Sequence, residues 1–245
     1  MNSAFGTSEF SPKKYARIGG WLYLIIILAG MFAEVFVRNK LFVSGDPTAT
    51  ADNIMNNQFL WRIGISADLI MQVCDLPLML IFYLLLKPVN KTIALLNLLF
   101  NLIQTAVLVA NKLSLLNALF LLGDAAYLKT FNPDHLYTLS YLSIKLHEFG
   151  FGVGLIFFGF VCLLEGYLII KSGYIPKTIG ILMQIAGLCY LTNSFALILV
   201  PKLANILFPV ILMPCLIGEL SLCLWLIIKG VKLEHWEKQQ KLMGY

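Results

Sequence analysis

Ionisable and amide side chains interrupt four long apolar stretches of this 245-residue sequence. Asp68, Gln72 and Asp75 lie in one stretch, and His147 and Glu148 lie in another. A charge at the bilayer centre costs roughly 2.5–3.5 kcal/mol on insertion scales, so such residues persist where they face one another, a water-filled cavity or a ligand. A histidine beside carboxylates could relay protons, bind a ligand or act as a general base. These residues therefore indicate a membrane protein with a polar interior.

The spacing of the polar residues predicts one intramembrane cavity. Asp68, Gln72 and Asp75 share one helical face, and the Asn and Gln residues at positions 97, 101, 104 and 111 form a stripe on the next helix. We expect the cavity to open toward the extracytoplasmic side and to have its floor near Asp75 and Glu219. The candidate lining residues are Glu34, Arg38, Arg62, Asp68, Gln72, Asp75, Asn101, Gln104, Asn111, Lys112, His147, Glu148, Asn193 and Glu219.

A purely structural role is the alternative for each of these residues. Hydrogen bonds between transmembrane helices contribute on average about 0.6 kcal/mol each, and the Asn and Gln stripe fits that role. Asp75 fits it poorly, because a carboxylate near the bilayer centre is costly. His147 is open to both interpretations, either as a proton relay or ligand, or as a histidine hydrogen-bonded to Asp68 or Asp75.

The composition excludes an ordinary soluble domain. Hydrophobic residues make up 59% of the chain, charged residues make up 13%, and the mean hydropathy is +0.83. The net charge of +5 does not indicate nucleic-acid binding, because no basic run is interleaved with aromatic residues. The cysteines form no CxxC pair and are expected to be small buried hydrophobic residues, namely Cys74, Cys162, Cys189, Cys215 and Cys223.

Six segments are long and apolar enough to cross a bilayer. They are predicted at approximately 18–37, 61–86, 92–122, 137–170, 177–199 and 204–228. The expected fold is therefore all-α, a polytopic six-helix bundle in which residues 1–245 form a single transmembrane domain. We interpret the first segment as an uncleaved helix rather than a signal peptide, because some twenty polar or mixed residues precede it.

Charge asymmetry predicts the orientation. With six spans, eleven of the 18 Lys and Arg residues lie at the end that holds both termini, five lie at the opposite end and two lie inside helices. Because positive residues are enriched in cytoplasmic loops, both termini are predicted to be cytoplasmic. The short links 87–91 and 171–177 predict antiparallel hairpins, and Asp46-Pro47 predicts a short surface helix capped by Thr48 or Thr50.

No motif indicates a metal or a cofactor. A metal site needs three or four ligands, and the candidate carboxylates and His147 are spread over several helices. His147-Glu148 is not followed by the second histidine of a zincin. One intramembrane histidine also gives haem no second axial ligand. We therefore expect no cofactor and no metal.

Several segments resemble the bacterial membrane proteins of the domain-of-unknown-function 4386 family. The resemblance spans about residues 16–230 and is carried by Phe32–Arg38, Asp68–Met71 with Asp75, Gly166–Pro176, and Gly218-Glu219-Leu220. The Gly-Tyr-Leu…Ser-Gly-Tyr…Pro stretch from Gly166 is its most specific part. The resemblance implies a six-helix protein of the bacterial inner membrane, and it implies no activity.

Three functions are compatible with the sequence. The first is binding or transport of a small molecule or lipid in the cavity, for which alternating access would need a homodimer. The second is an intramembrane enzyme that acts on a lipid through His147 with Asp68 or Asp75, although no Gly-x-Ser-x-Gly motif is present. The third is a structural or regulatory membrane partner whose polar residues fix helix register.

Overall fold

The computed structural model describes residues 11–208 and 210–242, and these residues contain helices and no strand. Within these described residues, ten α-helices are joined by one π-helical and two 3-10 segments. In chain order the elements are α1 (Pro12–Met31), π-helical η1 (Phe32–Arg38), α2 (Asn39–Leu41), α3 (Pro47–Asn56), α4 (Gln58–Leu86), α5 (Lys91–Leu121), 3-10 η2 (Ala126–Thr130), α6 (Pro133–Ser172), α7 (Lys177–Leu199), α8 (Pro201–Leu207), 3-10 η3 (Val210–Leu212), α9 (Met213–Ile228) and α10 (Leu233–Leu242).

In the part of the chain that the structure describes, six helical segments are long and apolar enough to cross a membrane, which confirms the predicted all-α polytopic bundle. They are Pro12–Leu41, Gln58–Leu86, Lys91–Leu121, Pro133–Ser172, Lys177–Leu199 and Val210–Ile228. The predicted start of the last segment at residue 204 is wrong. Residues 201–207 form the separate helix α8, and the sixth span begins at Val210.

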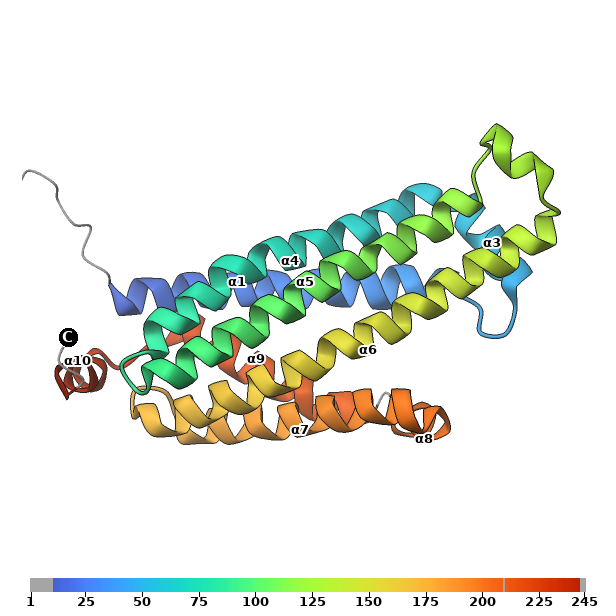
Figure 1. Ribbon diagram of the computed structural model, residues 1–245. Coiled ribbons are helices and arrows are strands. Elements are labelled where there is room, and N and C mark those ends of the chain that lie inside the picture. Colours follow the sequence, from blue (N-terminus) through green and yellow to red (C-terminus); the bar gives the residue numbers. More distant parts are fainter. Residues whose placement is uncertain (1–10, 209, 243–245) are drawn as a thin grey trace, which may run out of the picture.

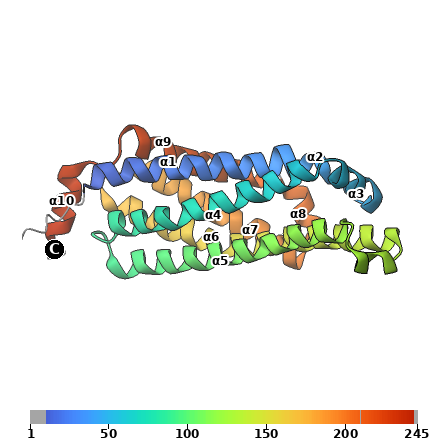
Figure 2. The ribbon, with the colours of Figure 1, turned by 90° about the horizontal axis from the view of Figure 1, so that it is seen from above.

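The long helices lie side by side, with α1, α4, α5 and α6 extending farthest (Figure 1). Helix α1 starts, and α10 lies, at one end of the bundle, which we call the termini end. The opposite end holds α3, and we call it the α3 end. Helices α7 and α9 are shorter, so α8 sits well short of the α3 end (Figures 1 and 2). The bundle is therefore thicker toward the termini end.

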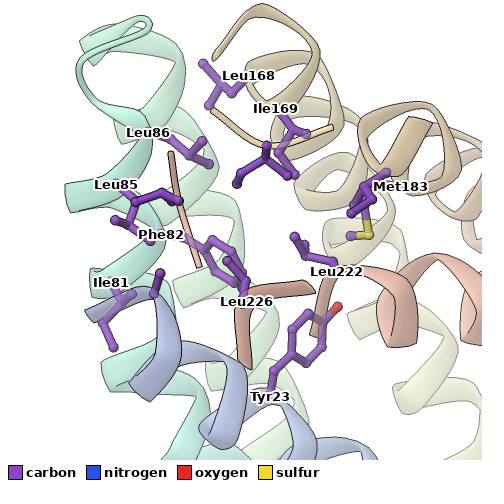
Figure 3. Close-up of a cluster of buried hydrophobic side chains, with 14 of the residues drawn as sticks. Tyr23, Ile81, Phe82, Leu85, Leu86, Leu168, Ile169, Met183, Leu222 and Leu226 are labelled. Atoms are coloured by element: carbon purple, nitrogen blue, oxygen red, sulfur yellow. The ribbon is translucent and has the colours of Figure 1, made fainter. Parts of the chain in front are cut away.

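Two apolar cores occupy the two ends of the bundle. The core at the termini end includes Tyr23 of α1, Phe82 of α4 and Leu222 of α9 (Figure 3). The core at the α3 end includes Ile54 of α3 and Trp61 of α4. Each core therefore joins helices that are distant in sequence.

The caps of α3 and α6 use residue types that favour helix ends, but the cap of α3 differs from the predicted one. A helix does form after Asp46-Pro47, but its N-terminal cap is Asp46, whose Oδ1 accepts from the Ala49 amide at 2.9 Å. Thr50 instead donates to the Asp46 carbonyl at 2.8 Å, so the predicted cap by Thr48 or Thr50 is wrong. Gly173 ends α6 with a φ of 74°, the left-handed conformation that favours glycine at this position.

The carbonyl of Leu85, near the C-terminus of α4, accepts two side-chain hydrogen bonds. The Tyr174 hydroxyl donates to it at 2.6 Å, and the Trp236 indole donates at 3.0 Å. Burial raises the pKa of Tyr174, so its hydroxyl remains a donor. These two hydrogen bonds join the α6–α7 link and α10 to the C-terminal end of α4, where helix carbonyls have no partner within the helix.

Tyr174→Phe is expected to lower the free energy of unfolding by about 1 kcal/mol, a typical net value for one neutral hydrogen bond. The loss stays small because Trp236 still donates to Leu85. Reversible unfolding in mixed detergent micelles measures it. Tyr174→Phe combined with Trp236→Phe should cost more than the sum of the two single changes, because only the double variant leaves the carbonyl without a side-chain donor. Strict additivity would contradict the shared-acceptor explanation.

Candidate ligand-binding cavity

The predicted polar residues divide into two groups instead of forming one site. The first group is an ion-pair network near the α3 end, built on Asp68. Arg38 Nη1 donates to Asp68 Oδ2 at 2.6 Å, and Arg38 Nε donates to Glu34 Oε2 at 2.7 Å. Lys112 Nζ lies 3.0 Å from the same Asp68 Oδ2, an ionic contact without hydrogen-bond geometry. Two acidic and two basic side chains thus balance one another across η1, α4 and α5.

His147 lies beside this network and pairs with Asn111. The Asn111 Nδ2 lies 2.9 Å from His147 Nδ1 and donates to the His147 carbonyl at 2.9 Å. Among the described residues, neither Asp68 nor Asp75 is hydrogen-bonded to the imidazole, which was the partner expected from sequence. His147 is therefore a buried histidine joined to α5 by an amide.

The second group lines a cavity of about 260 Å³ between the two apolar cores. All six candidate spans contribute to its wall. Five of the predicted residues line it, namely Gln72, Asp75, Asn101, Gln104 and Glu219. Four further polar residues line it that were not among the predicted site residues, namely Tyr23, Asn97, Glu165 and Tyr190.

Three carboxyl groups face this cavity from three helices. Asp75 of α4 accepts hydrogen bonds from the Thr105 hydroxyl and, at 3.4 Å, from Asn101 Nδ2. Glu219 of α9 accepts from the Tyr190 hydroxyl. Glu165 of α6 is buried, and its Oε1 has no hydrogen-bond partner within the protein. Each neutral hydroxyl or amide contact stabilises a carboxylate without cancelling its charge.

Unpartnered oxygens distinguish the cavity from the ion-pair network. Besides Glu165 Oε1, the side-chain oxygens of Gln72 and Asn101 are buried without a hydrogen-bond partner in the protein. The orientation of the Asn101 amide is defined by its donation to Asp75. Leaving such groups unpaired costs about 1–3 kcal/mol each, so all three acceptors favour a donor in the cavity.

The rest of the lining is apolar and partly aromatic. Phe82, Phe151 and Phe158 contribute rings. The Phe151 ring also lies 5.7 Å from Lys112 Nζ, which places this side chain between the cavity and the ion-pair network. Met31 of α1, at 43% exposure, is the most exposed part of the wall, and Leu212 of η3 lies partly exposed in the same lining. The cavity therefore approaches the apolar surface of the bundle through residues of α1 and η3.

Three predicted site residues line neither the cavity nor the network. Arg62 is exposed on α4. Glu148 is 42% exposed and pairs with Lys145 at 2.8 Å. Asn193 is half-buried on α7, and its Oδ1 has no hydrogen-bond partner. The structure places none of the three in the cavity wall with Asp75 and Glu219.

Glu165 is the main residue that the sequence analysis missed. It lies about two turns before the C-terminal end of α6, at Ser172. Only the three-dimensional structure shows that it shares a cavity with Glu219, in a bundle where α7 packs against both α6 and α9. The described residues contain no group of three or more His, Cys, Asp or Glu side chains close enough to hold one metal ion. The three carboxyl groups are therefore spread around a larger volume.

Comparison with known proteins gives two matches of interest. A family model described as a domain of unknown function (DUF4386) matches residues 18–230. An uncharacterized protein of Archaeoglobus fulgidus is 32% identical over 164 residues, which cover 66% of this chain and 81% of that protein. No solved structure matches the chain. The residues matched by the family model include parts of all six candidate spans that line the cavity.

Proposed function

The chain belongs to the DUF4386 family of membrane proteins, and from that premise we propose that it binds or transports a small molecule or lipid in the cavity between its spans. One observation carries the proposal. Side chains from all six candidate spans line a cavity of about 260 Å³ that contains buried polar groups without partners. Polar residues that only fix helix register are expected to pair with one another, as Asp68 does in its ion pairs with Arg38 and Lys112.

The size of the cavity sets the scale of the ligand. Pockets for drug-sized molecules enclose about 300–1,000 Å³, so this cavity fits a metabolite or the end of a longer molecule. Because every span contributes to the wall, we propose that the chain acts as a single domain. The proposed location is the bacterial inner membrane with both termini in the cytoplasm, where the excess of Lys and Arg at the termini end belongs.

The enzyme proposal receives no support from these contacts. His147 is occupied by Asn111, and Asp68 is occupied by Arg38 and Lys112. A general base must lie within hydrogen-bond reach of the proton that it removes and must be oriented by a partner. The network around Asp68 instead fits the structural role, in a part of the bundle that does not line the cavity.

Native mass spectrometry of the gently solubilised protein tests the proposed function. We expect a noncovalent adduct on the wild type, and we expect Leu155→Trp to lose it because the larger side chain fills space that Leu155 now borders. Leu146→Trp is the matched control, since Leu146 lies on the same helix and is 63% exposed on its outer face. The same spectra report whether the protein is a homodimer.

Three results of the same experiment would contradict the proposed function. An adduct that survives in Leu155→Trp lies outside the cavity and would assign it to surface lipid. A wild type that carries no adduct in any preparation would favour the structural role. A Leu146→Trp variant that loses the adduct as fully as Leu155→Trp would show that added bulk on α6 acts through folding.

A further inference from the structure

We propose that the occupant of the cavity is a protonated amine attached to an apolar body, an inference that rests on the proposed function. The charges around the cavity have one sign, its unpartnered buried atoms are hydrogen-bond acceptors, and the remaining wall is apolar and aromatic. Each of these points to the same class of molecule.

The charge around the cavity is one-sided. Asp75, Glu165 and Glu219 approach it from α4, α6 and α9, and at most 9% of any of these side chains is exposed. None of the described lining residues is Lys, Arg or His. A buried carboxylate without a countercharge is costly in a membrane, and an ammonium group supplies the missing charge. An anionic ligand would add to the repulsion.

The unpartnered atoms select hydrogen-bond donors. The buried atoms Glu165 Oε1, Gln72 Oε1 and Asn101 Oδ1 are all oxygens that line the cavity and lack partners within the protein. An ammonium group that carries N–H bonds can donate to several of them, whereas a quaternary ammonium cannot. The preferred ligand is therefore a protonated primary or secondary amine.

The remaining wall fits an apolar body next to that charge. Phe82, Phe151, Phe158, Tyr23 and Tyr190 contribute aromatic rings to the lining. Ring faces attract cations when the two lie within about 6 Å of each other, and aliphatic or aromatic groups pack against the same surfaces.

Two sources could supply such an amine. One is a free amphipathic amine, and the other is a lipid whose headgroup ends in a primary amine. The exposed position of Met31 in the cavity wall gives a membrane molecule an approach from the side of the bundle. A phosphate next to the headgroup amine would lie near the three carboxyl groups, so the free amine fits better.

Calorimetric titration of the full chain in phosphatidylcholine nanodiscs tests the ligand class, with empty nanodiscs subtracted. Four probes share a phenyl ring and a two-carbon linker, and they differ in the end group: 2-phenylethylamine, its trimethylammonium analogue, 2-phenylethanol and 3-phenylpropionate. We expect the amine to bind at least tenfold more tightly than the alcohol and the quaternary analogue. The propionate should bind least.

Glu165→Gln is the diagnostic variant, because it removes a charge and keeps the shape. We expect roughly tenfold weaker binding of 2-phenylethylamine, as for loss of one hydrogen bond to a charged group, and unchanged binding of 2-phenylethanol. Glu148→Gln is the matched control on the same helix, since its carboxylate pairs with Lys145 outside the cavity. Gln72→Met removes another unpartnered oxygen and provides a second test if Glu165→Gln unfolds.

A second set of nanodiscs that contain phosphatidylethanolamine separates the two sources. If the affinity for 2-phenylethylamine falls about tenfold in these nanodiscs, the lipid headgroup competes for the site and is assigned as its occupant. If the affinity is unchanged, the site is assigned to a free amine. Equal affinity for amine, alcohol and propionate would overturn the amine class while the proposed binding function stood. A wild type that binds none of the probes would overturn the amine class, and a missing adduct in mass spectrometry would then remove the binding function as well.

Discussion

Asp68→Asn is expected to lower the free energy of unfolding by about 3–5 kcal/mol, the usual cost of breaking a buried ion pair from one side. The change preserves the shape of the side chain but removes the negative charge that Arg38 and Lys112 share. The Lys112 side chain is only 2% exposed, so its ammonium group would be left buried beside an uncharged amide. Arg38 retains Glu34, which limits the loss. Reversible unfolding in mixed micelles, followed by tryptophan fluorescence, measures the change.

Two companion variants make this prediction specific. Glu34→Gln removes a carboxylate that is 48% exposed, and it should cost no more than about 1 kcal/mol. Lys112→Met added to Asp68→Asn should restore part of the lost stability, because the uncompensated ammonium group is removed with its partner. Equal losses in Asp68→Asn and Glu34→Gln, or no recovery in the double variant, would contradict the account of a buried network centred on Asp68.

The transmembrane architecture was predictable because bilayer thickness sets a strong length requirement. All six spans agree with the sequence within about four residues at their C-terminal ends. The prediction fails at the N-terminal end of the sixth span, where hydropathy stays high from residue 204 although α8 is a separate helix and the span begins at Val210. Apolar composition alone does not distinguish a membrane-spanning turn of helix from a short helix beside the bundle. The π-helical segment η1 was likewise invisible, since Phe32–Arg38 has an ordinary helical pattern.

The sequence predicts a polar cavity between the helices, but it does not predict which residues line that cavity. Helical periodicity puts Gln72 and Asp75 on one face, and both residues line the cavity together with Glu219. Periodicity fixes the relative direction of residues within a helix, whereas the rotation of one helix against another depends on packing. That rotation decided that Asp68 pairs with Arg38 and that Glu165 faces the cavity.

Packing between α6 and α7 depends on glycines at which the two backbones nearly touch. A Cβ atom added at Gly166 would lie 2.5 Å from the Gly180 carbonyl oxygen and 3.0 Å from the Gln184 amide nitrogen. Seven residues along each helix, a Cβ atom at Gly187 would lie 2.7 Å from the Gly159 carbonyl oxygen. Since backbone atoms cannot rotate out of the way, even one methyl group must push the helices apart.

Gly166→Ala is therefore expected to lower the free energy of unfolding by about 2–3 kcal/mol, toward the upper end of the cost of overpacking. The better helix propensity of alanine offsets about 1 kcal/mol of a larger clash. Gly152→Ala is the matched control on α6. Its added Cβ would meet only the tip of the Leu197 side chain, at 2.7 Å, and that side chain is half-buried and free to change rotamer. The same unfolding assay should therefore give a loss below about 1 kcal/mol for Gly152→Ala.

Separation of α6 from α7 also links this contact to the cavity. Helix α6 supplies Glu165, and helix α7 supplies Tyr190, which donates to Glu219. If Gly166→Ala moves the two helices apart, 2-phenylethylamine should bind several-fold more weakly in the fraction that remains folded, while Gly152→Ala should bind as the wild type does. Loss of stability without loss of binding would show that the cavity adjusts to helix spacing. In that case the carboxyl groups, and not the distance between α6 and α7, would determine affinity.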